Sequence, residues 1–92
     1  MDLIRTLNSI GKRALVKYYF DFKNKGVDSC LACFEENYTY HGKYTRVINA
    51  KRIFRESMHI QALEIVSASN RVDGETKRKA KELLALERKS NV

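Results

Sequence analysis

The chain has 92 residues, a formal net charge of +7 and a hydrophobic fraction of 43%. This length fits one domain with a modest core, and the composition is that of a folded globular chain rather than a disordered one. No run approaches the ~20 apolar residues of a membrane span, and the first residues lack the apolar segment of a signal peptide. We therefore expect a single cytoplasmic domain over residues 1–92 that has no membrane partner.

The chain contains no proline and only four glycines, which favours helices. Apolar residues recur at three- and four-residue steps and predict a first helix over residues 3–24. Gly11 lies inside this apolar stripe, and we interpret it as a point of close approach between helices. Val16 and Phe20 fall off the stripe. They are either isolated surface residues or a contact for a partner or for the chain's own C-terminal part.

A short second helix is predicted over residues 29–36. Gly26 is suited to a left-handed end of the first helix, and Asp28 or Ser29 is the expected N-terminal cap of the second.

Residues 37–44 allow two interpretations. Tyrosines alternate with polar residues around a central glycine, which fits a small hairpin. A lone hairpin is marginal in water, so we expect a loop instead. A third helix is predicted over residues 43–57, with Val47, Ala50 and Phe54 on its inward side.

The apolar pattern changes phase near Ser57, which predicts a break and a fourth helix over residues 59–68; one longer helix is the alternative. Asp73 is expected to cap a final helix that ends at about residue 89. Together these elements predict an all-α fold, a small bundle of four to five helices. The predicted core consists of Leu7, Ala14, Tyr18, Phe22, Leu31, Phe34, Val47, Phe54, Ile65 and Leu83.

The order of a long helix, a short helix and a basic third helix resembles helix-turn-helix modules over residues 3–57. In such modules the third helix enters the major groove of DNA. The predicted connection before the third helix has six to eight residues, longer than that of the tight motif. The resemblance implies a helix-turn-helix-like arrangement of the first three helices, with residues 58–92 as supporting or oligomerising helices.

Cys30 and Cys33 form a C-x-x-C pair within an apolar segment. A redox pair is expected in a βαβ context, which the pattern lacks. A zinc site needs four ligands, and the spacing of the further candidates, His41 and His59, is not that of a zinc finger. We expect both cysteines to be reduced, buried and without metal.

Catalytic constellations are not evident in the sequence. The two histidines are far apart in the chain, and neither lies beside an obvious acid. Glu35 and Glu36 form an acidic pair at a helix end, which we interpret as a solvated face. No glycine-rich phosphate loop is present. We therefore predict that the protein is not an enzyme and carries no cofactor.

The strongest functional signal is a run of positive charge. Residues 37–55 contain five basic residues and no acidic one, with aromatic residues between them, whereas residues 56–92 mix seven basic with six acidic residues. This pattern is typical of contact with a polyanion. The candidate nucleic-acid-binding residues are Lys43, Tyr44, Thr45, Arg46, Ile48, Lys51, Arg52, Arg55 and His59.

The leading hypothesis is a small basic DNA-binding protein, a regulator, that contacts duplex DNA with the exposed face of the helix over residues 43–57. The alternative is a helical protein–protein interaction module that oligomerises or binds a partner protein. Its interface would be formed by Val16 and Phe20 or by the final helix.

Overall fold

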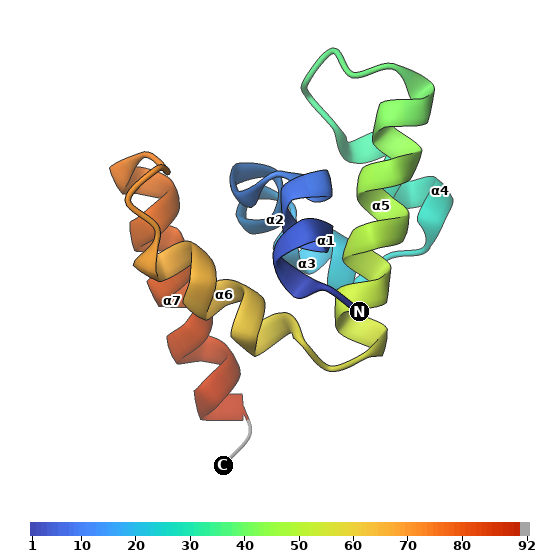
Figure 1. The fold of residues 1–92 in the computed structure, drawn as a ribbon. Coiled ribbons are helices and arrows are strands. Elements are labelled where there is room, and N and C mark those ends of the chain that lie inside the picture. Colours follow the sequence, from blue (N-terminus) through green and yellow to red (C-terminus); the bar gives the residue numbers. More distant parts are fainter. Residues whose placement is uncertain (91–92) are drawn as a thin grey trace.

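A computed structural model describes residues 1–90, which form seven helices and no strand (Figure 1). The all-α prediction is confirmed. The number of helices is larger than the predicted four to five, mainly because the expected first helix is divided into three. The helices are α1 (Leu3–Ile10), α2 (Lys12–Lys17), α3 (Tyr19–Asn24), α4 (Val27–Cys33), α5 (Tyr40–Arg55), α6 (His59–Ala68) and α7 (Gly74–Ser90).

Gly11 divides the predicted first helix. Its φ of 91° lies in the left-handed region, where a residue without a Cβ is favoured. A Cβ at this position would meet nothing closer than Ala14 at 3.9 Å. Gly11 therefore allows the chain to change direction between α1 and α2. The interpretation of Gly11 as a point of close approach between helices was wrong. A second interruption falls at Tyr18, with φ −110° and ψ 24°.

The second helix begins and ends earlier than predicted. Gly26 has φ −71° and ψ 171°, which is extended backbone, so the prediction of a left-handed end was wrong. Gly26 itself is the N-terminal cap of α4, and neither Asp28 nor Ser29 caps the helix. The helix ends at Cys33, so the connection to α5 comprises residues 34–39.

The third helix, α5, begins at Tyr40, so only residues 37–39 of the expected loop are non-helical. Thr39 caps α5, because its hydroxyl accepts a hydrogen bond of 3.0 Å from the Gly42 amide. The predicted break is confirmed at Ser57, whose φ is 57°. The predicted cap at Asp73 is also confirmed, with the Thr76 amide donating to its carboxylate at 3.1 Å.

The helices are arranged so that α5 and the α6–α7 pair lie on opposite sides of α1–α3 (Figure 1). Of the ten predicted core residues, six are buried: Leu7, Ala14, Tyr18, Phe22, Val47 and Leu83. The other four, Leu31, Phe34, Phe54 and Ile65, are half-buried and pack against that core. None of the helices in residues 1–90 is long and apolar enough to span a membrane.

The two residues that fell off the apolar stripe have different environments. Val16 is only 2% exposed and lies beside Thr76 and Lys79 of α7, so it is a contact for the chain's own C-terminal part. Phe20 is 45% exposed. Of the two residues proposed as a protein–protein interface, only Phe20 is therefore available at the surface.

Candidate nucleic-acid interface

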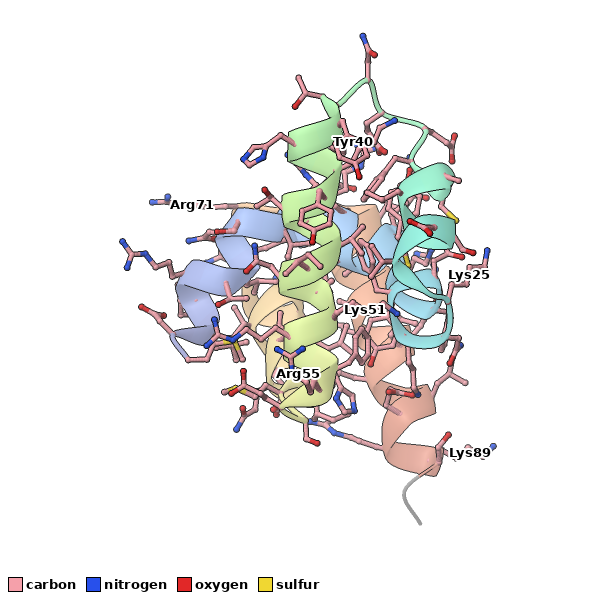
Figure 2. The ribbon with its side chains drawn as sticks, turned by 90° about the vertical axis from the view of Figure 1, so that its right-hand side faces the viewer. Lys25, Tyr40, Lys51, Arg55, Arg71 and Lys89 are labelled. Carbon is pink, nitrogen blue, oxygen red and sulfur yellow. The ribbon has the colours of Figure 1, made fainter. Side chains whose placement is uncertain are left out.

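The candidate interface is the outer face of α5, which crosses the front of the molecule in Figure 2 between α1 and α4. Three residues at positions typical of one helix face, Val47, Ala50 and Ile53, are fully buried and hold α5 against the core. The helix contains no acidic residue from its first position to its last. Its outer face can therefore attract an anion without competition from a carboxylate on the same helix.

The residues on this outer face are large and exposed. Tyr40, at the upper end in Figure 2, is 71% exposed, and Tyr44 one turn later is 44% exposed. Ile48 follows at 40%, and Arg52 and Arg55 are exposed at the far end. Tyr40 was not among the predicted site residues, although the four-residue spacing to Tyr44 places it on the same face.

The structure separates the nine predicted residues into two groups. Four are exposed: Tyr44, Ile48, Arg52 and Arg55. Five are half-buried: Lys43, Thr45, Arg46, Lys51 and His59. Within residues 1–90, Lys43 and Arg55 have no carboxylate within ion-pair distance. Among the predicted site residues, Lys43 and Arg55 are the cations that form neither an ion pair nor a side-chain hydrogen bond within the described residues.

Arg46 is held by the protein itself. Its guanidinium lies 3.7 Å from the centre of the Tyr38 ring, and Nη1 donates to the Gly42 carbonyl at 3.0 Å. A cation against an aromatic face gains electrostatic attraction in this position. Gly42 leaves room for the arginine, because a Cβ there would lie 3.2 Å from Nη1. The structure thus gives Arg46 the role of fastening the loop before α5, which the sequence did not indicate.

Two further cations of α5, Lys51 and Arg52, each contact another part of the protein. The Lys51 ammonium donates to the carbonyl of Lys25, the residue after α3, and so helps to join α5 to the end of α3. Arg52 forms an ion pair of 2.9 Å with Glu56 on the protein surface. Exposed pairs at this spacing contribute about 0.3–0.5 kcal/mol, so a phosphate can compete for Arg52.

His59 was predicted to continue the basic face of the third helix, and this placement is wrong. The helix ends at Arg55, and His59 begins α6 after the break. Its ring stacks on Phe54 with centroids 5.3 Å apart, and its Nε2 lies 3.7 Å from a carboxylate oxygen of Glu87. The Nδ1 atom is buried and has no hydrogen-bond partner in the structure.

Glu87 is the centre of a buried polar cluster that the sequence analysis missed. Its side chain is 6% exposed, and it accepts hydrogen bonds of 2.8 Å from both the Tyr19 hydroxyl and the Lys23 ammonium. Burial acts to raise the pKa of Glu87, but these hydrogen bonds outweigh burial and hold the pKa below its ordinary value. His59 has no acid beside it in the sequence, and the fold brings Glu87 to it from α7.

The loop before α5 is fixed at its base by another carboxylate. Glu36 accepts a hydrogen bond of 2.6 Å from the Tyr18 hydroxyl and forms an ion pair of 2.8 Å with Lys17. The Tyr18 hydroxyl in turn accepts from the Glu35 amide at 2.9 Å. The interpretation of the two glutamates as a solvated face was correct only for Glu35, whose side chain is 77% exposed.

The stability of this loop attachment should depend on pH. The hydrogen bond from Lys17, with that from Tyr18, lowers the pKa of Glu36 from 4.5 to about 2. A carboxyl group with a depressed folded-state pKa stabilises the fold above pH 4.5, and that contribution is lost as pH falls from 4.5 towards 2. We expect Glu36→Gln to lower the free energy of unfolding by about 1–2 kcal/mol at pH 7, and the difference from the parent should shrink as the pH falls from 4.5 towards 2. Urea denaturation as a function of pH measures this.

Glu35→Gln is the matched control for this prediction, since the exposed Glu35 carboxylate lies 3.7 Å from the same lysine. We expect it to change stability by less than about 0.5 kcal/mol at any pH. Equal losses for both variants would show that Glu36 holds the loop no more strongly than the exposed Glu35.

The cysteines differ from each other. Cys30 is buried as predicted, and its thiol donates to the Asp21 carbonyl at 3.2 Å. Burial raises the pKa of Cys30. Cys33 is half-exposed, which contradicts the prediction that both are buried. In residues 1–90 there is no cluster of three or more His, Cys, Asp or Glu side chains that could hold a metal ion.

An open pocket lies elsewhere, between α2 and the start of α7. Its lining residues are Arg13, Val16, Lys17, Glu75, Thr76 and Lys79. Lys17 is already bound by Glu36, and Glu75 supplies a negative charge within the lining. The pocket therefore lacks the one-sided charge of the α5 face, and it contains no residue of the predicted site.

Comparisons of the chain with models of protein families, with curated proteins and with solved structures find no match. The functional interpretation therefore rests on the chemistry of the α5 face.

Proposed function

We propose that this protein binds nucleic acid along the outer face of α5. The observation that carries the proposal is a surface helix without a single carboxylate, whose outer face combines arginine with exposed tyrosine. Lys43 and Arg55 can neutralise phosphates, and Arg52 can exchange its weak surface pair with Glu56 for a phosphate. The formal net charge of +7 adds a long-range attraction for a polyanion.

The position of α5 leaves the start of the helix accessible to a nucleic acid. Its first turn and the preceding loop lie at one end of the molecule, with Tyr40 near the tip (Figure 2). In helix-turn-helix proteins the N-terminal residues of the recognition helix contact the bases. A regulatory protein that contacts bases with the start of α5 would use the same end of its helix. The six-residue connection from α4 is longer than that of the tight motif.

Replacement of Arg55 by alanine tests the proposal. Arg55 is exposed and has no ion pair in the described residues, so Arg55→Ala should leave folding unchanged. We expect weaker binding to all nucleic-acid sequences, and we expect the slope of log K against log salt to fall by about one. Fluorescence anisotropy with a labelled strand at about 50 and 200 mM salt measures both quantities.

Lys81→Ala is the matched control. Lys81 is also exposed, but it belongs to α7, on the opposite side of α1–α3 from α5 (Figure 1). Its loss should change binding much less than the loss of Arg55. Equal effects of the two variants, or no binding by the parent at low salt, would contradict the proposed function.

A protein partner is the second candidate, and one observation favours it. Phe20 on α3 and Leu86 on α7 are 45% and 52% exposed, outside the α5 face. Large exposed apolar residues are frequent in protein interfaces. An interface of this kind should depend little on salt. Sedimentation of the parent and of a Phe20→Ala/Leu86→Ala variant would reveal a self-associated form that the variant loses.

A further inference from the structure

We infer that the α5 face takes an unpaired strand, and that the Tyr40–Tyr44 pair stacks with its bases. This inference rests on the proposed function and specifies its ligand as single-stranded nucleic acid. The sequence alone predicted a duplex. The difference arises from the geometry of the two tyrosine rings, which the sequence does not show.

The two rings present parallel, accessible faces. Their centroids are 6.4 Å apart, and their planes differ by only 20°. Nearly parallel rings of this kind offer aromatic faces on which bases can stack. With Tyr40 71% and Tyr44 44% exposed, both rings are accessible to a ligand.

An unpaired strand fits this geometry better than a duplex. The faces of bases inside a duplex are covered by their neighbours, whereas bases of a single strand can turn out and stack on aromatic side chains. Stacking of this kind contributes about 1–3 kcal/mol per base and tolerates any base, because every base has an aromatic face.

Aromatic contacts attach the loop before the two tyrosines to the core. The guanidinium of Arg46 is stacked on Tyr38, and the Tyr38 ring contacts Phe34 edge to face, with centroids 5.6 Å apart. Phe34 contacts Tyr18 of the core in the same way at 5.0 Å. Aromatic and cation–π contacts thus extend without a gap from the core to the loop before Tyr40. The backbone that carries Tyr40 is thus attached to the core through this loop.

The rest of the face supplies charge for the backbone of the strand. Lys43 lies beside the tyrosine pair in sequence, and Arg55 lies 15 residues after Tyr40, about 22 Å along the helix axis. A strand stacked at the tyrosines and following the helix would pass Ile48 and reach the arginines. Basic residues along such a path, with aromatic rings at one end, are typical of proteins that bind single strands.

The test compares an oligo-dT strand, an oligo-U strand and a DNA duplex of equal length, by fluorescence anisotropy at low salt. We expect both single strands to bind more tightly than the duplex, and the stronger of the two identifies DNA or RNA as the ligand. Tyr40→Ala and Tyr44→Ala should each weaken single-strand binding by about 5-fold to 100-fold. Tyr40→Phe should retain binding, since stacking needs the ring and not the hydroxyl.

Phe20→Ala removes a ring outside α5 that is about as exposed as Tyr44, and it should leave binding unchanged. The inference is overturned if the duplex binds at least as tightly as the single strands and the tyrosine variants bind like the parent. The proposed function still stands in that case if Arg55→Ala weakens binding. If neither strand nor duplex binds at low salt, both are overturned. Circular dichroism confirms that each variant is folded.

Discussion

Replacement of Glu87 by alanine is expected to lower the free energy of unfolding by about 3 kcal/mol. The variant would leave the buried Tyr19 hydroxyl without its acceptor and would remove the counter-charge of Lys23. It would also free the space beside His59, whose Nε2 lies 3.7 Å from the lost carboxylate. The Glu87 carboxylate joins its own helix, α7, to residues of α3 and α6, so its removal weakens the contacts among three helices. Urea denaturation at pH 7 measures the loss.

Glu82→Ala is the matched control for this prediction. Glu82 lies on the same helix and pairs with Arg78, but its side chain is 58% exposed. Removal of such a surface pair should cost less than about 1 kcal/mol. Similar losses for Glu82→Ala and Glu87→Ala would contradict the importance of the buried cluster. Glu87→Gln should fall between the two, because it keeps an acceptor for Tyr19 and loses the charge that attracts Lys23.

The all-helical class was predictable because helical periodicity is a local signal, visible over a few turns in the chain. The division of the first helix was not, since the same apolar stripe continues through Gly11 and Tyr18. Periodicity reports which residues face inward and does not report a change of axis. Gly11 was compatible both with close packing and with a break, and only its φ of 91° distinguishes them.

The candidate site was predictable in part for a similar reason. The position of Arg55 on the outer face follows from the burial of Val47 and Ala50 on the other side of the helix. The attachment of Arg46 to Tyr38 depends on how the loop returns over the first turn of α5, and the start of that helix was placed three residues too late. Some cations of the basic run, such as Arg46, are held by contacts within the protein. The number of basic residues in the run therefore overstates how many can bind a nucleic acid.

The contacts that sequence analysis missed join residues that are distant in the chain. Tyr19 and Glu87 are 68 positions apart, and Tyr18 and Glu36 are 18 apart. Glu87 lies at helical spacing from the buried Ala80, Leu83 and Leu84 of α7. However, nothing in the local pattern indicates which helix supplies the partner of a buried carboxylate. Such a residue on an apolar stripe is nevertheless a signal that a buried donor must exist elsewhere.

Replacement of Phe22 by alanine is expected to cost about 3–5 kcal/mol, a large share of the 5–15 kcal/mol typical of a domain. Phe22 is 1% exposed, and its ring lies 6.2 Å from that of Tyr18 and 6.1 Å from that of Phe34, centre to centre. Truncation would leave a cavity within this aromatic cluster, because the neighbouring rings of Tyr18 and Phe34 are held by other contacts and relax only in part. Thermal and urea denaturation measure the loss.

Phe20→Ala is the control that isolates burial from residue type. The same substitution two positions earlier on α3 removes a ring that is 45% exposed and contacts Tyr19 edge to face at 5.3 Å. Alanine also has the higher helix propensity, which offsets part of the lost contact, so we expect a change below about 1 kcal/mol. If the two variants lose equal stability, Phe20 must be covered in solution. A self-associated form through α3 would then be the explanation, which the sedimentation experiment detects independently.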